Sequence, residues 1–117
     1  MSIDDPRTVA RLMDAMGEHL PIPVSATTEL AQTLQQGGLN FKAGRSLSIE
    51  RVFYGGDEGG ISCYIAPTPG VKEVVLCSLT HLRIERGHPL YREIRAYQRE
   101  RNRRIAASHL QDLSRDP

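Results

Sequence analysis

Apolar and polar residues alternate most clearly between residues 51 and 84, where strand-like runs are separated by turn-forming segments. Extended runs begin at Ser46, Ile61 and Val71, and GGDEGG and PTPG stand between them. Runs rich in β-branched and aromatic residues, bounded by glycine and proline clusters, are typical of strands joined by hairpins. The pattern predicts a three-stranded antiparallel meander at the centre of the fold.

Two four-residue loops, GDEG and PTPG, would fix the register of this meander. The expected cross-strand pairs are Tyr54 with Ile61, Val52 with Cys63, Cys63 with Val74, and Ile61 with Leu76. Because side chains alternate between the two faces, Ile49 and Cys77 would lie on the face opposite Cys63, and no disulfide would form. Helices are expected to cover the face of Cys63 and Val74, and a polar row of Arg51, Tyr64 and Glu73 would cross the other face.

The third run can stay extended to residue 84, although its pairing in this register ends near Leu76. Residues 77–84 would then overhang by about 26 Å. An unpaired strand edge needs a cover, which could come from segment 39–45, from a helix or from a second copy of the chain. A bend near Ser78 or Thr80 would instead end the strand early. The overhang predicts a homodimer, with these candidate partner-binding residues: Cys77, Leu79, His81 and Arg83.

Helical periodicity appears at both ends of the chain. Asp5 and Pro6 read as the start of a helix that ends before Pro21, with one apolar stripe of Val9, Leu12, Met13 and Met16. A short helix is expected between Thr27 or Thr28 and Gly37, anchored by Leu30 and Leu34.

A long last helix is expected from Leu90 to at least Ala107. Its apolar seam of Leu90, Ile94, Tyr97 and Ile105 is interrupted by Arg101. The chain therefore predicts a single α+β domain over residues 1–117, in the order ααβββα, with the conformation of residues 39–45 left open.

The composition is that of a globular protein and does not indicate a particular reaction. Hydrophobic residues make up 39% and charged residues 25% of the 117 residues, which is ordinary for a globular domain. The longest apolar run, residues 74–77, is far too short to span a membrane. The N-terminus has no secretory pattern and the chain has only two cysteines, so we expect a cytoplasmic protein without membrane contact.

Charge is unevenly distributed along the chain. Residues 86–104 hold seven arginines against Glu93 and Glu100, which gives +5, so the rest of the chain must sum to −4 to reach the net charge of +1. Arginine suits phosphate oxygens, and the candidate phosphate-binding residues are Arg92, Arg95, Arg99, Arg103 and Arg104. The alternatives are an acidic protein partner or a solvated helix face stabilised by pairs such as Glu100 with Arg104.

No segment matches a catalytic, metal or nucleotide motif. Asp57 and Glu58 are too few for a calcium site, and Cys77 with His81 lacks a third orienting group. Joining Cys63, Cys77, His81 and His88 gives no zinc spacing. We therefore predict no catalytic residue, metal or cofactor. The expected function is a small interaction or regulatory protein that forms a homodimer through the third strand or the exposed sheet face, with nucleic-acid binding by the last helix as the alternative.

Overall fold

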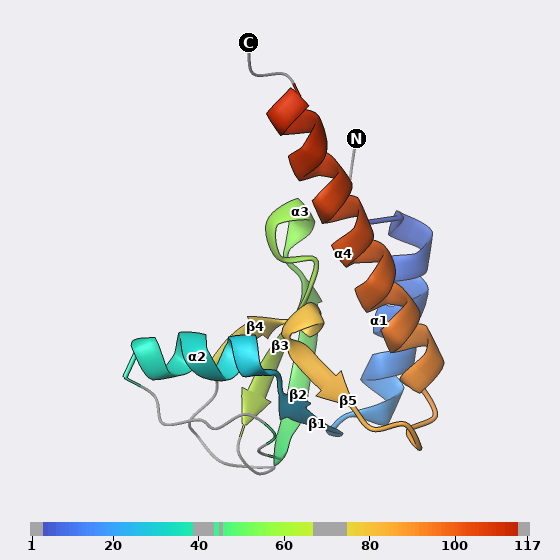
Figure 1. Ribbon diagram of the computed structural model, residues 1–117. Helices are drawn as coiled ribbons and strands as arrows, with labels where there is room; N and C mark the ends of the chain where they lie inside the picture. Colours follow the sequence, from blue (N-terminus) through green and yellow to red (C-terminus); the bar gives the residue numbers. More distant parts are fainter. Residues whose placement is uncertain (1–3, 39–43, 45, 67–74, 115–117) are drawn as a thin grey trace.

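The computed structural model describes residues 4–38, 44, 46–66 and 75–114, and its fold is α+β (Figure 1). In chain order the elements are α1 (Pro6–His19), β1 (Ile22–Ala26), α2 (Thr28–Gln36), β2 (Ser46–Tyr54), α3 (Gly56–Gly59), β3 (Ile61–Ala66), β4 (Val75–Ser78), the 3-10 turn η1 (Leu79–His81), β5 (Leu82–Ile84) and α4 (Tyr91–Ser114).

The sheet has five antiparallel strands in the order β4-β3-β2-β1-β5, so the predicted three-stranded meander is incomplete. The strand that the sequence interpretation missed is β1, whose residues Ile22, Val24 and Ala26 are buried in alternation. Proline is unusual inside a sheet because it cannot donate a ladder hydrogen bond. Pro23 is tolerated because it is exposed and because β5 pairs with Val24–Ala26 only.

The predicted overhang of residues 77–84 is wrong, because the third run is broken in its middle. Ser78 ends β4, its side-chain oxygen accepts a hydrogen bond from the Thr80 N–H, and the 3-10 turn follows. Beyond the turn, β5 pairs with β1 inside the same chain. The bend that was the alternative in the sequence interpretation is therefore the observed structure.

This crossover also curls the sheet. Strands β4 and β5 form its two edges, yet the chain passes from one to the other through η1 alone. Four residue steps span at most about 14 Å, whereas the outer strands of a flat five-stranded sheet lie about 19 Å apart. The two edges must therefore turn toward each other around one core.

The predicted register is confirmed for the first hairpin and wrong for the second. Tyr54 pairs with Ile61 and Val52 with Cys63, as expected. Between β3 and β4, however, Cys63 pairs with Cys77 and Ile65 with Val75, so the register is shifted by three residues from the expected pairing of Cys63 with Val74. Val74 and the PTPG segment lie outside the described residues.

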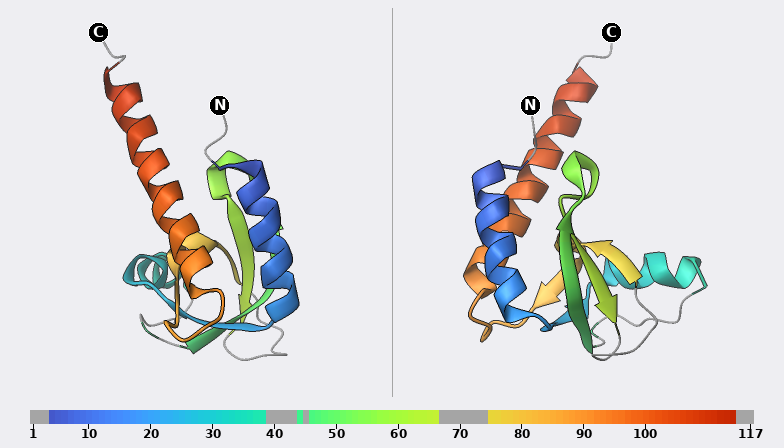
Figure 2. Two further views of the ribbon diagram at one scale, coloured as in Figure 1. Left: turned by 90° about the vertical axis from the view of Figure 1, so that its right-hand side faces the viewer. Right: turned by 180° about the vertical axis from the view of Figure 1, so that it is seen from behind.

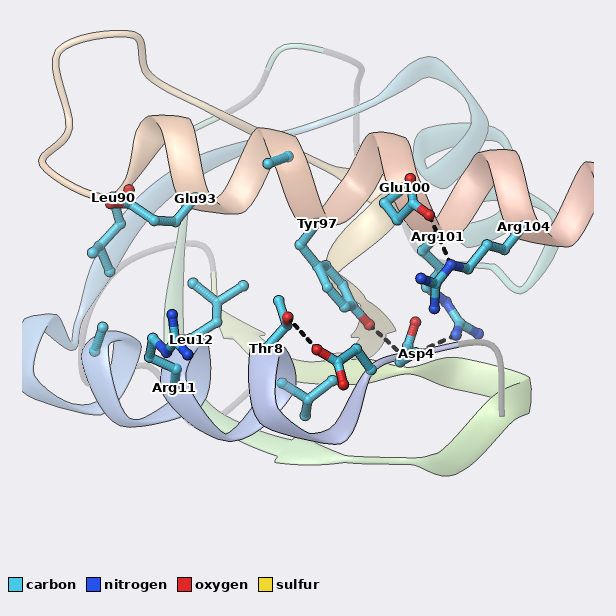
Figure 3. Close-up of a pocket in the computed structure, with 14 residues that line it drawn as sticks. Asp4, Thr8, Arg11, Leu12, Leu90, Glu93, Tyr97, Glu100, Arg101 and Arg104 are labelled. Carbon is cyan, nitrogen blue, oxygen red and sulfur yellow. Dashed lines mark hydrogen bonds and ion pairs between the residues drawn. The ribbon is translucent and has the colours of Figure 1, made fainter. Parts of the chain in front are cut away.

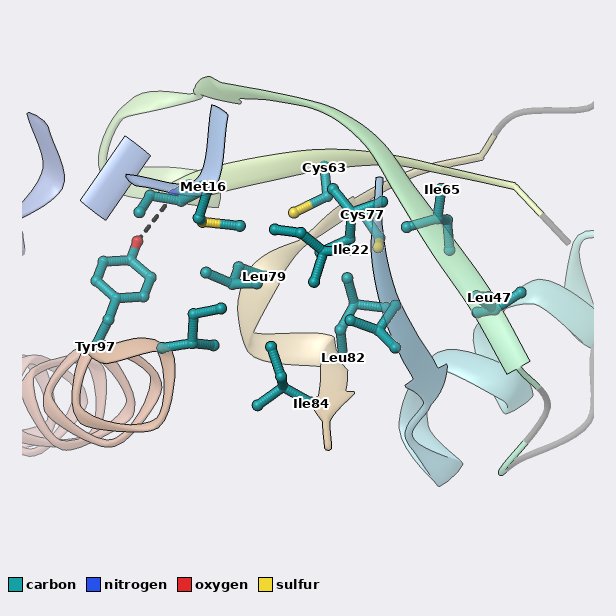
Figure 4. Close-up of a cluster of buried hydrophobic side chains, with 14 of the residues drawn as sticks. Met16, Ile22, Leu47, Cys63, Ile65, Cys77, Leu79, Leu82, Ile84 and Tyr97 are labelled. Atoms are coloured by element: carbon teal, nitrogen blue, oxygen red, sulfur yellow. Dashed lines mark hydrogen bonds between the residues drawn. The ribbon is translucent and has the colours of Figure 1, made fainter. Parts of the chain in front are cut away.

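The odd shift of three residues turns β4 over, so Cys63 and Cys77 share the inner face, contrary to the prediction (Figure 4). Ile49 is also fully buried rather than on the opposite face, because a bulge between Ile49 and Arg51 inserts one residue into β2. In the predicted polar row, Arg51 does pair with Tyr64, but Leu76 is the next neighbour of Tyr64. Glu73 lies outside the described residues.

The three predicted helices are confirmed, and they cover the sheet from two sides (Figure 2). Helices α1 and α4 lie side by side on one side, and α2 lies at the other end of the sheet. Thr27 caps α2 by accepting a hydrogen bond from the Leu30 N–H. Of segment 39–45, only Gly44 is described, and its N–H donates to the Ala26 carbonyl. The C-terminal half of α4 extends past the rest of the fold (Figure 1).

Gln98 of α4 holds the crossover in place. Its side chain is 2% exposed, and its Nε2 donates to the carbonyl oxygens of Leu79 at 2.7 Å and Leu82 at 2.8 Å. Leu79 begins the 3-10 turn, and its carbonyl also accepts the hydrogen bond of the Leu82 N–H that closes this turn. A buried carbonyl without a donor costs about 1–3 kcal/mol, so Gln98 stabilises the crossover by adding a second donor at Leu79 and by donating to the carbonyl of Leu82.

We expect Gln98→Leu to lower the free energy of unfolding by about 1–3 kcal/mol, since the Leu82 carbonyl loses the Gln98 donor while the Leu79 carbonyl keeps the Leu82 N–H. Arg99→Leu is the matched control, because Arg99 is the exposed neighbour on the same helix, and it should change stability by less than about 0.5 kcal/mol. Urea unfolding followed by circular dichroism measures both. Equal stability of the two variants would contradict the assignment.

Candidate functional site

A buried carboxylate, that of Asp4, lies where α1, α4 and the tip of the β2–β3 hairpin meet (Figure 3). Its Oδ2 accepts hydrogen bonds from the Tyr97 hydroxyl at 3.0 Å, from Arg101 Nη1 at 3.0 Å and from the Tyr54 hydroxyl at 3.2 Å. The Asp4 and Arg101 side chains are only 3% and 2% exposed. The two charges thus form a buried pair with supporting hydrogen bonds, the condition under which such a pair is tolerated.

Tyr97 connects this pair to the sheet. Its hydroxyl oxygen accepts a hydrogen bond from the Ile61 N–H at 2.8 Å while the hydroxyl donates to Asp4. Burial raises the pKa of Tyr97, so the phenol stays protonated and keeps donating. Gly60, with φ of 63°, lies so close to Tyr97 and Arg101 that a side chain at this position would clash.

A cleft of about 490 Å³ runs between α1 and α4, with Asp4, Tyr97 and Arg101 at one end (Figure 3). Apolar side chains such as Leu12 and Leu90 line it. The lining also includes Thr8, whose hydroxyl donates to Asp5 Oδ2 at 2.8 Å. The network of Asp4, Tyr97 and Arg101 connects the start of α1 with α4 and with the hairpin tip.

The four residues predicted to bind a partner do not share one strand face. Cys77 is 9% and Leu79 1% exposed, and both belong to the hydrophobic core. His81 is exposed at the end of η1, where its carbonyl accepts hydrogen bonds from Thr27. Arg83 is exposed on β5, opposite Ser25. The four residues are separated because the 3-10 turn η1 interrupts the extended run, so their side chains no longer alternate along a single strand.

The predicted phosphate-binding arginines fall into two groups. Arg103 and Arg104 both pair with Glu100, at 2.6 and 2.7 Å, which confirms the expected pair of Glu100 with Arg104. Hydrogen bonds from Arg103 and then Arg104 lower the pKa of Glu100 to about 2, so the carboxylate stays charged at neutral pH.

The other arginines of the set have a different environment. Arg95 Nη1 donates to the Gln98 side-chain oxygen at 2.8 Å. Arg92 and Arg99 are exposed and have no ion-pair partner in the part of the chain that the structure describes. The helix therefore carries two solvated cations that its own acids do not neutralise.

The cysteines offer no reactive thiolate. Burial raises the pKa of Cys77 to about 12 and raises that of Cys63 further. A thiol with such a pKa is protonated at neutral pH and is a poor nucleophile. Within residues 4–38, 44, 46–66 and 75–114, no three His, Cys, Asp or Glu side chains gather where a metal ion could bind.

The outer face of β2, β3 and β4 carries exposed apolar side chains. Tyr64 is 38% and Leu76 54% exposed, and the rings of Phe53 and Tyr64 lie 5.4 Å apart. Leu76 lies directly across from Tyr64 and next to the outer edge of β4. The sequence interpretation had placed Leu76 on the inner face, and the shifted register is what exposes it.

Comparisons with protein-family models, with curated proteins and with solved structures found no match. Among the described helices, none combines the length and the apolar character that crossing a membrane requires.

We expect Asp4→Asn to lower the free energy of unfolding by about 3–5 kcal/mol, because Arg101 would keep a buried charge without its counter-ion. Asp5→Asn is the matched control: Asp5 is exposed, and Asn caps a helix as well as Asp does, so the change should stay below about 0.5 kcal/mol. Thermal unfolding of both variants at one pH tests this. A similar loss of stability in the two variants would show that the buried pair of Asp4 and Arg101 does not stabilise the fold as proposed.

Proposed function

We propose that this chain is a small interaction protein without catalytic activity that forms a homodimer through the edge of β4 and the outer sheet face beside it. The observation that carries the proposal is Leu76, which is 54% exposed on an edge strand. The raised pKa values of both buried thiols support a non-catalytic function. The scarcity of cysteine supports a cytoplasmic location, where thiols stay reduced.

Within its described residues, β4 carries none of the side chains that usually protect an edge strand from pairing. Its sequence, VLCS, has no charge, no proline and no glycine, whereas protected edges carry such residues. The opposite edge of the sheet, β5, has the exposed charge of Arg83 at its centre. The two edge strands therefore differ in charge: β5 carries an exposed arginine that discourages pairing with another strand, and β4 carries no charge.

A second copy of the chain is the occupant that fits this edge. A strand can pair antiparallel with its own copy about a two-fold axis, because both partners present the same backbone donors and acceptors. If the axis passes beside Leu76, the two Leu76 side chains become cross-strand neighbours, and Tyr64 of each copy extends the apolar stripe. The dimer would thus cover the large apolar side chain that is most exposed among the described residues.

We expect the wild-type chain to sediment at twice its 13.0 kDa mass at high micromolar concentration, and Leu76→Lys to sediment as a monomer. A lysine at this position places two like charges opposite each other across the two-fold axis. Ala10→Lys adds the same charge at an exposed site on α1 and should leave the mass unchanged. A monomeric wild-type chain in sedimentation equilibrium would refute the dimer.

A second candidate function is nucleic-acid binding through α4, favoured by the solvated cations Arg92 and Arg99. They are seven residues apart, so they lie on one side of the helix about 10 Å from each other. Arg103 lies on the same side but shares its charge with Glu100. Phosphates that replace counter-ions at such a row would bind in a salt-dependent way.

We expect the wild-type chain to shift a labelled single-stranded oligonucleotide at low salt, and the shift to weaken steeply as salt rises. Arg92→Glu with Arg99→Glu should abolish the shift. Glu18→Lys, which changes an exposed charge on α1 in the opposite sense, should keep it. An oligonucleotide that the wild-type chain does not retard at low salt would dismiss this function.

A further inference from the structure

A second cleft, of about 410 Å³, lies between β5, the segment that follows it and the first turns of α4. Three cationic side chains line it, Arg83, Arg86 and Arg95, together with Thr27, Thr80 and Tyr91. No acidic residue is among its lining residues. The chain as a whole carries 15 basic and 14 acidic residues, so a cleft with three cations and no acid departs clearly from its average.

Arg95 is held in place in this cleft. Its Nη1 donates at 2.8 Å to the side-chain oxygen of Gln98, whose Nε2 itself donates to the carbonyls of Leu79 and Leu82. The guanidinium has five N–H donors, and this bond occupies one of them. The rigid crossover thus positions a partly buried arginine whose other donors remain available to a ligand.

Arg83 and Arg86 reach the same cleft from its other side. Both are exposed, and neither has an ion-pair partner among the residues that the structure describes. Like charges that share a cleft repel one another, and an anion placed among them removes the repulsion while accepting their hydrogen bonds. Tyr91, partly buried at the start of α4, adds a hydroxyl that makes no hydrogen bond within the described part of the chain.

The positive charge continues from this cleft along α4. Arg92 precedes Arg95 by three residues and Arg99 follows it by four, which makes them its neighbours on the helix surface. An isolated phosphate would need only the cleft. A chain of phosphates would also use the solvated row outside it.

We propose that the cleft of Arg83, Arg86 and Arg95 binds a phosphate of a single-stranded nucleic acid, whose neighbouring phosphates follow Arg92 and Arg99. This inference rests on the second candidate function and adds to it the residues that form the anchoring site. Arginine forks recognise phosphate oxygens through two parallel hydrogen bonds. Three arginines from two elements can surround one phosphate in a way that a single helix face cannot.

The test is fluorescence anisotropy of a labelled 12-nucleotide oligo-U with the full chain, over a series of salt concentrations. The double variant Arg83→Ala with Arg86→Ala should bind about tenfold more weakly, and its plot of log K against log salt should be shallower by about 1.4, since each lost phosphate contact removes about 0.7. The control, Arg7→Ala with Arg11→Ala, removes the same charge from the exposed side chains of α1 and should bind like the wild type.

Four outcomes would count against the inference. Wild-type affinity and slope in the Arg83 and Arg86 double variant, with binding lost in the Arg92 and Arg99 variant, would overturn the cleft and keep the second candidate function. No binding by the wild-type chain would overturn both. An equal loss in the α1 control would show that net charge alone matters. Displacement of the oligonucleotide by UMP at equal concentration would show that the cleft takes a single phosphate and not a strand.

Discussion

The buried pair of Asp4 and Arg101 connects distant parts of the chain at one end of the hydrophobic core. Asp4 precedes α1, Arg101 lies in α4, and Tyr97 bridges both to the start of β3. Removing two charges from water is costly, and the arrangement is stable because three donors converge on one carboxylate oxygen. This geometry holds α4 against the start of α1 and against the hairpin tip.

Gln98 lies about one helical turn before Arg101 on α4. It donates hydrogen bonds to buried backbone carbonyls, whereas Arg101 pairs with the buried charge of Asp4. The sheet curls because β4 and β5 are joined by a short 3-10 turn, and Gln98 donates hydrogen bonds to the carbonyls of Leu79 and Leu82 at this turn. The Gln98 side-chain oxygen also accepts a hydrogen bond from Arg95 and so orients it. The inner face of α4 therefore stabilises the fold while it positions one wall of the basic cleft.

The two proposed binding surfaces lie on different parts of the curled sheet. The outer face of β2, β3 and β4 exposes Tyr64 and Leu76 beside Arg51 and ends at an edge strand without charges, whereas the cleft beside β5 is cationic. The proposed dimer uses the edge of β4, whereas the basic cleft is lined by β5, the segment after it and the first turns of α4.

The sequence by itself determined the helices and the first hairpin. The apolar stripe of α1, the cap at Thr27 and the pairing of Tyr54 with Ile61 depend on neighbours within one element or one tight turn. The alternation of Ile22, Val24 and Ala26 was visible too, but the prolines around it concealed β1.

Tertiary structure alone decided the rest. In the sequence, Arg101 interrupts the apolar stripe of the last helix. Only folding brings it into contact with Asp4, 97 residues away. The break at η1 and the convergence of Arg83, Arg86 and Arg95 likewise arise because the curled sheet brings distant segments together, which no local pattern encodes.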